Sequence, residues 1–144
     1  MVMFQFVAVF AATLFTGAAA YINVAEDPAR MECGTVLAST VFGPSHRRAA
    51  LMQVLLAVIA TIAGVGAWFA GGGPNWLVGS LLIFAIVPFT LVVIRPTNNQ
   101  LLNPTIDRTS DRTRHLLLRW GWLHGVRTIL ALASSILFLS SLWL

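Results

Sequence analysis

The sequence contains no lysine, a single cysteine and only five acidic residues in 144 positions. One cysteine, Cys33, excludes an intrachain disulfide and a metal cluster held by cysteines. Charged residues make up 10% of the chain, against about 25% in an ordinary soluble domain. The net charge of +4 comes from nine arginines in a chain that is 58% apolar. This composition argues against a soluble basic domain and a nucleic-acid partner, and we interpret the arginines as membrane topology signals or anionic-lipid contacts.

Four apolar runs dominate the chain. A helix needs about 20 apolar residues to cross the hydrocarbon core of a bilayer, and four runs reach that length, at about 2–25, 49–70, 76–94 and 122–144. A secretory signal peptide has basic residues before its apolar segment. The first run has none, so we expect a retained helix. The sequence predicts one all-α domain, an integral membrane four-helix bundle in contact with the lipid bilayer.

Prolines and capping residues mark the expected ends of the helices. Pro28 follows Asp27, a capping residue type, which predicts that the first span ends near Glu26 and that a short interfacial helix follows over 28–42. Arg95 and Pro96 are expected to end the third span. A cap near Ser110 predicts a last helix of about 35 residues, which is too long for the bilayer core alone.

The arginines are distributed unevenly between the predicted loops. Eight lie in the segments 26–48 and 95–121, and Arg127 lies just inside the fourth span. The connection between spans two and three and both chain ends carry no charged side chain. The positive-inside rule then predicts a multi-pass protein of the plasma membrane with both loops cytoplasmic and both termini on the outer side.

The last apolar run carries a polar stripe on one helical face. At about 100° per residue, the residues that share this face are Trp120, His124, Arg127, Ala131, Ser134, Ser135 and Phe138. Trp122 falls on the opposite side, where an interfacial anchor would lie. Small residues are favoured where membrane helices touch, so we expect His124 and Arg127 to face the inside of the bundle.

An inward arginine needs a partner, because an unpaired charge inside a membrane protein is costly. Glu26 lies at a similar depth to Arg127, and we predict an ion pair between them. The alternative is that Arg127 extends to lipid phosphates and Glu26 is solvated. Asn23 lies one turn deeper and adds a hydrogen bond. His124 has no histidine or glutamate at metal-binding spacing, so no metal is expected.

Three motifs together resemble one family. The segments "YINVAEDPAR", "PFTLVVIRPTNNQLL" and "LLRWGWLHGVRT" are similar to those of the anthrone oxygenase-like family of small four-helix membrane proteins. The resemblance extends over nearly the whole chain, and departs from the family pattern at Asp27, where members commonly have histidine. It implies oxidation of a lipophilic aromatic or quinone-like substrate by O₂ without a cofactor.

The resemblance also implies a set of site roles. An anthrone has an acidic methylene, and its anion reacts with O₂, so the site needs a base, a donor to the oxyanion and flat apolar walls. We assign the base to His124, the oxyanion contact to Arg127, and Glu26 to the same catalytic group. Trp120, Asn98 and Asn23 are the predicted substrate-binding residues.

A second class of function is left open. The chain is alternatively a non-catalytic subunit or assembly factor of a larger membrane complex, in which the polar group only locks the bundle. Small residues in the first two spans suit either a compact bundle or a homo-oligomer. A cavity lined by His124 and Arg127 favours the enzyme, and filled space favours the structural protein.

Overall fold

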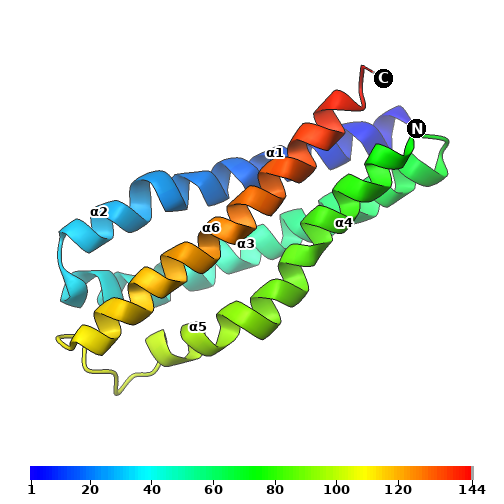
Figure 1. Cartoon of the computed structure of the whole chain (residues 1–144). Helices are drawn as coiled ribbons and strands as arrows, with labels where there is room; N and C mark the ends of the chain where they lie inside the picture. Colours follow the sequence, from blue (N-terminus) through cyan, green and yellow to red (C-terminus); the bar gives the residue numbers. More distant parts are fainter. Residues whose placement is uncertain (144) are drawn as a thin grey trace.

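The computed structural model describes residues 1–143 and contains α-helices, two π-helical turns and short connections (Figure 1). Four helical stretches are long and apolar enough to cross a membrane: Val2–Glu32, Thr35–Phe69, Pro74–Leu101 and Asp111–Ser140. The predicted all-α architecture, with four helical stretches long and apolar enough to cross a membrane, is confirmed. Leu144, the last residue of the fourth predicted span, lies outside the described residues.

Two of the four stretches are interrupted by a π-helical turn. The first stretch consists of α1 (Val2–Tyr21), the π-helical turn η1 (Ile22–Glu26) and α2 (Asp27–Glu32). The third consists of α4 (Pro74–Phe89), the π-helical turn η2 (Thr90–Ile94) and α5 (Arg95–Leu101). The second and fourth stretches are the single helices α3 (Thr35–Phe69) and α6 (Asp111–Ser140).

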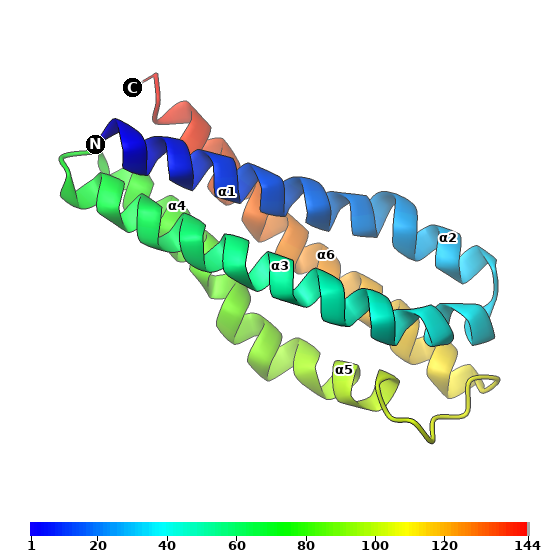
Figure 2. The ribbon, with the colours of Figure 1, turned by 180° about the vertical axis from the view of Figure 1, so that it is seen from behind.

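The four stretches pack as a bundle in which each touches two main neighbours. Helix α1 packs against α3 and α6, and α4 packs against the same two helices from the other side. Figure 2 shows α1 and α3 side by side, with α5 diverging from the lower part of α3. Prolines and π-helical turns are the usual causes of helix bends, and the third stretch has Pro88, η2 and Pro96 in succession.

Small residues allow this close packing, as in many membrane bundles. A Cβ atom added at Gly64 would lie 2.7 Å from Phe138 Cζ, and one added at Gly79 would lie 2.5 Å from Phe138 Cε1. The Phe138 ring is fully buried between these helices and stacks on Trp76. The two glycines therefore make room for the Phe138 ring of the α6 stripe.

The break after the first span differs from the prediction. Residues 28–32 continue the first helical stretch, and residues 35–42 are the first turns of α3, which runs through Pro44 without interruption. No separate interfacial helix forms over 28–42. The chain turns instead at Cys33 and Gly34, and Gly34 has a φ of 92°, which suits glycine. The predicted ends at Pro28 and Pro96 are also wrong, because each proline lies in the first turn of the helix that follows a π-helical turn.

The cap at Ser110 is confirmed. Its side-chain oxygen accepts a hydrogen bond from the backbone N–H of Thr113 at 3.2 Å, and α6 begins at Asp111. Both chain ends lie at one end of the bundle, and α2, α5 and the start of α6 lie at the other (Figure 1). The arginine-bearing segments therefore share one end.

The outward faces of the four stretches are apolar. Among the exposed side chains are Ile62 at 65%, Val92 at 73% and Trp122 at 81%. Soluble monomers rarely expose such continuous apolar surface. This distribution is compatible with a multi-pass membrane protein, and Trp122 faces outward as predicted.

Candidate functional site

A polar layer separates two apolar clusters inside the bundle. One cluster is built around Phe15, Trp76 and Phe138, and the other around Phe42 and Trp120. Along α6, the residues between the two clusters are His124 and Arg127, which are 1% and 7% exposed. All seven residues of the predicted α6 stripe are buried. The helical periodicity of the sequence therefore located the inward face of α6 correctly.

Arg127 is held by an amide from α3. Its Nη2 donates a hydrogen bond of 2.8 Å to Oε1 of Gln53, which is only 2% exposed. The guanidinium also lies over the Phe15 ring, 5.7 Å from its centroid. Within the described residues, Arg127 has no carboxylate within 4.0 Å. The guanidinium of Arg127 thus contacts only neutral groups, and its Nε–H has no hydrogen-bond partner among the described residues.

The predicted Glu26–Arg127 ion pair is wrong. Glu26 accepts a hydrogen bond of 2.7 Å from Ser45 Oγ, and it lies 3.9 Å from Arg30 Nη1. Arg30 also contacts Asp27 at 3.3 Å. Similar depth along two helices does not bring their side chains onto facing sides, and Glu26 is already engaged by α2 and α3.

Asn23 fixes the orientation of the His124 ring. Its amide nitrogen donates to the backbone carbonyl of Gly121 at 3.0 Å, and its oxygen accepts from Thr128 Oγ1 at 2.7 Å. A carbonyl can only accept, so the Asn23 amide has one orientation and its oxygen faces His124 Nδ1 at 2.8 Å. The Nδ1 atom must then carry the proton. His124 Nε2 is left with the free lone pair, as a base requires.

The absence of a side chain at Gly121 permits this contact between η1 and α6. A Cβ atom at Gly121 would lie 2.6 Å from Asp27 Oδ2. The glycine therefore lets the first stretch approach α6 closely, and the π-helical turn η1 presents Asn23 to the ring.

The larger of two cavities at this layer lies between α3 and the bent third stretch. Its volume is about 180 Å³. The apolar wall includes Phe15, Ala57 and Ile86, and the polar residues that line it are Gln53, His46, Thr90, Arg95, Asn98 and Arg127. The cavity is thus an apolar slot with its polar groups gathered toward the arginine-bearing end.

A second, much smaller cavity of about 20 Å³ adjoins the first. Trp120, His124 and Arg30 line only this one, and the two cavities share His46, Ala50, Gln53 and Arg127 as common walls. Trp120 and His124 are neighbours, with ring centroids 4.9 Å apart. Phe42 packs edge-on against Trp120 and stacks on His46.

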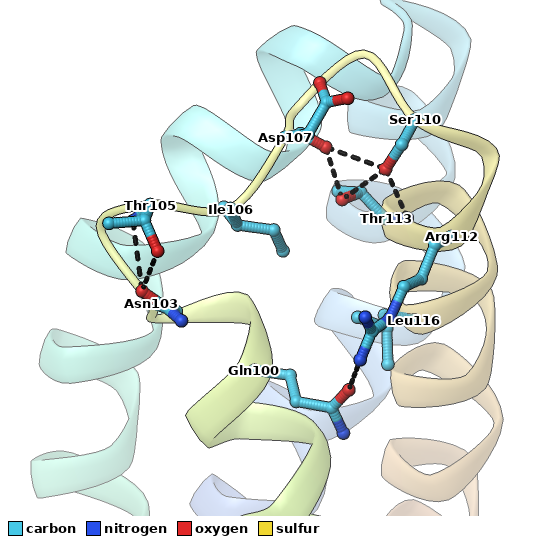
Figure 3. A pocket seen from close by; sticks show the side chains of 9 residues that line it. All are labelled: Gln100, Asn103, Thr105, Ile106, Asp107, Ser110, Arg112, Thr113 and Leu116. Atoms are coloured by element: carbon cyan, nitrogen blue, oxygen red, sulfur yellow. Dashed lines mark hydrogen bonds between the residues drawn. The ribbon is translucent and has the colours of Figure 1, made fainter.

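A larger pocket than either cavity, of about 440 Å³, lies elsewhere. Figure 3 shows it between α5, the 102–110 connection and the start of α6. Its polar groups bond to one another: Gln100 accepts from Arg112 at 3.0 Å, and Asn103 accepts from Thr105. Because these groups are exposed and already paired, the size of this pocket does not make it the chemical site.

The structure brings together most of the predicted site residues. Trp120, His124 and Arg127 line the small cavity, Asn98 and Arg127 line the larger one, and Asn23 acts through His124. Glu26 lines neither cavity.

Sequence reasoning missed two residues. Gln53 is uncharged and lies in the middle of an apolar run, and it was noticeable only as the single amide side chain in that run. His46 lies outside the three motifs that resemble the family and was not predicted as a site residue. In residues 1–143, no group of three or more His, Cys, Asp or Glu side chains is placed to hold a metal ion.

Comparison with known proteins identifies the family. The sequence model of the anthrone oxygenase family matches residues 1–137. The chain belongs to this family. The resemblance drawn from the three motifs is therefore confirmed.

Curated anthrone oxygenases include several relatives. The chain is 37% identical over 71 residues to anthrone oxygenase tpcL of Aspergillus fumigatus, an alignment that covers 46% of this chain and 44% of that protein. It is 24% identical to the noranthrone monooxygenase of Aspergillus flavus, over 92% of this chain and 70% of the relative. It is 27% identical to anthrone oxygenase dmxR16 of a Cryptosporiopsis species, over 90% and 80%.

The first of these alignments spans less than half of the relative's length. No solved structure matches the chain significantly. The family is thus established by sequence, and the arrangement of the site comes from the structure described above.

Proposed function

We propose that this chain is a membrane-embedded oxygenase that oxidises a lipophilic, anthrone-like polyketide with O₂ and without a cofactor. The observation that carries the proposal is Arg127, a buried guanidinium with no carboxylate partner, in the wall of an apolar cavity. A buried unpaired charge is costly. An anionic ligand in the cavity would remove that cost, and the anion of an anthrone is such a ligand.

The cavity walls suit this ligand. An enolate or phenolate oxygen would lie against Arg127, with Asn98 as a second polar contact, and flat rings would lie along Phe15 and Ile86. Donors aimed at a developing oxyanion contribute strongly to catalysis when water is excluded. Membrane lipids would supply both an apolar substrate and O₂.

The proposed reaction begins with loss of a proton from the substrate methylene. His46 lines the larger cavity and His124 does not, so we assign this proton to His46 in place of the predicted His124, and we place His124 beside the oxygen species in the small cavity. The substrate anion then forms a C–O bond with O₂, and the peroxide takes up the proton. The hydroperoxide loses water, as its O–O bond and the remaining C–H bond break, and a quinone carbonyl remains.

The orientation in the membrane belongs to the same proposal. The arginine-bearing end faces the cytoplasm by the positive-inside rule, and both termini face outward. The polar ends of the cavities then lie near the cytoplasmic headgroups. A substrate made by cytoplasmic enzymes would enter from that side or along the bilayer.

A filled interior would favour a non-catalytic subunit. The cavity lined by both His124 and Arg127 has a volume of about 20 Å³ and adjoins the cavity of about 180 Å³ beside Arg127, and this open space supports the enzyme. Purified protein in lipid nanodiscs should accelerate O₂ uptake by anthrone, with one anthraquinone formed for each O₂ consumed. The measurements are an oxygen electrode and product absorbance, with protein-free nanodiscs as the control for spontaneous oxidation. Equal rates in the two samples would end the proposal for this substrate class.

A further inference from the structure

The small cavity is surrounded by hydrogen-bond donors that have no acceptor among residues 1–143. Four buried N–H groups of its lining lack a partner: Arg30 Nε, Gln53 Nε2, Trp120 Nε1 and Arg127 Nε. Each of these residues is at least nine-tenths buried, at 8%, 2%, 4% and 7% exposure respectively. Buried donors without partners are rare and call for an explanation.

The Gln53 amide cannot be turned to remove the mismatch. Its oxygen faces Arg127, whose guanidinium has only donors, so its nitrogen must point elsewhere. Trp120 Nε1 and the Nε atoms of both arginines are also donors only. The acceptors on this lining are His124 Nε2, because Nδ1 is committed to Asn23, one ring nitrogen of His46 and the hydroxyl oxygen of Ser45. The four donor groups without partners still outnumber these three acceptors.

The size of the cavity limits its occupant. A volume of about 20 Å³ is slightly more than the 10–15 Å³ or so that one water requires on the same measure. A water molecule accepts about two hydrogen bonds, which leaves the other donors unpaired. An anion of one or two heavy atoms accepts from every side and also compensates the charge of Arg127.

We propose that this small cavity is a binding site for a small anion and that, during turnover, it holds superoxide formed from O₂. One electron passes from the substrate anion in the larger cavity to O₂, giving a substrate radical and superoxide. The radical and superoxide then form the C–O bond, and the peroxide anion takes the proton that the base removed. The shared walls of the two cavities place the electron donor beside the acceptor. The role in turnover rests on the proposed oxygenase function, whereas the anion site does not.

Bromide is the probe for the anion site. We expect sodium bromide to raise the melting temperature of the protein in nanodiscs saturably, against sodium gluconate at equal ionic strength. In crystals, the anomalous signal of bromide should lie between Trp120, Gln53 and Arg127. Absence of saturable binding in the unaltered protein would overturn the proposal.

The matched variants are Gln53→Glu and Gln100→Glu. Both substitutions keep the side-chain shape, add one negative charge and leave an arginine partner, Arg127 or Arg112. Gln53→Glu should weaken bromide binding by at least about tenfold, because like charges placed together repel strongly. Gln100→Glu should bind bromide as the unaltered protein does. Equal binding in all three proteins would place the anion elsewhere and overturn the assignment.

Two further measurements keep the test decisive. If Gln53→Glu does not fold, Trp120→Phe removes one donor and keeps an aromatic ring, and it should weaken bromide binding a few fold. Unchanged bromide affinity in a folded Trp120→Phe protein would again overturn the site. In turnover, bromide should compete with O₂, and inhibition that persists at high O₂ would overturn the superoxide role. If the unaltered protein binds bromide but oxidises no anthrone, the proposed function fails and the anion site stands.

Discussion

Two glutamine–arginine pairs of this bundle make almost the same contact in different surroundings. Gln53 accepts from Arg127 at 2.8 Å inside the polar layer, and Gln100 accepts from Arg112 at 3.0 Å at the open end of the molecule. The inner pair is buried and leaves donor atoms without partners. In the outer pair Arg112 is exposed and Gln100 is half-buried, so water or lipid headgroups can satisfy the polar atoms that the protein leaves unpaired. Burial, more than contact geometry, turns one pair into a candidate reaction centre.

Replacing Arg127 of the inner pair and Arg112 of the outer pair should reveal the largest difference between the two pairs. Arg127→Met should lower anthrone oxidation by about 100- to 1,000-fold, the usual cost of losing an oxyanion donor. Its melting temperature should stay the same or rise, because a buried cation without a counter-ion is replaced by an apolar side chain of similar length. Arg112→Met should change neither quantity measurably.

Oxygen uptake and thermal unfolding of the two variants are the measurements for this prediction. A strong loss of stability in Arg127→Met would mean that the arginine mainly holds the bundle together. If Arg127→Met oxidises anthrone at nearly the rate of the unaltered protein, Arg127 is not the donor to the oxyanion.

The histidines provide the next comparison. His46→Gln should lower turnover by about 100-fold or more, the usual range for a general base. At alkaline pH the substrate loses its proton in solution, so part of the lost turnover should return. His115→Gln is the matched control, since that histidine is exposed and bonds only to the backbone of its own helix. A pH–rate profile with the same fold loss at every pH would show that His46 does not remove the proton.

A smaller effect is expected from the residue that orients His124. Asn23→Ala removes three hydrogen bonds and should cost about 1–3 kcal/mol of stability. It should also release the His124 ring from its single tautomer. Nitrogen NMR of histidine-labelled protein distinguishes the Nδ1–H and Nε2–H forms. A ring that remains entirely Nδ1–H in the variant would contradict the orienting role of Asn23.

The smallest expected effect concerns the pKa of Asp107, which lines the pocket of about 440 Å³. Hydrogen bonds from the Thr109 hydroxyl and backbone N–H lower the pKa of Asp107 below its ordinary 3.8. A carboxyl whose pKa is depressed by folding stabilises the fold above its unfolded pKa and loses this contribution as pH falls through the lower, folded value. The amide resonance of Thr109 should therefore titrate with a midpoint below 3.8, without a change in anthrone oxidation at neutral pH. A midpoint at or above 3.8 would show that these hydrogen bonds do not favour the ionised form.

Sequence periodicity predicted the direction of side chains within one helix far better than contacts between helices. The stripe through His124 and Arg127 follows directly from 100° per residue, and so does the outward position of Trp122. The partner of Arg127 did not follow, because two helices at equal depth can be rotated in many ways about their own axes. Only acidic residues were considered as partners of Arg127, so the neutral Gln53 was not predicted.

The helix ends at Pro28 and Pro96 were mispredicted for a local reason. Each proline was expected to end an α-helix, since it lacks the N–H that the helix interior needs. In the structure a π-helical turn precedes each one, and the proline occupies the first turn of the next helix, where that N–H is not required. The volumes and walls of the two cavities could not be predicted either, because they depend on the bend that these turns introduce.

The two π-helical turns also make the site sensitive to chain length. A π-helical turn holds about one residue more than an α-helical turn and takes up that residue locally. Deleting one residue from η1 (Ile22–Glu26), such as Val24, would restore an α-helical turn and remove the widened turn that presents Asn23 to His124, while α2 and Arg30 kept their orientation. A single codon at either turn therefore changes the shape of the polar layer without changing how the helices beyond it pack. In this bundle, two extra residues, one in each π-helical turn, determine how the residues of the reaction centre are aligned.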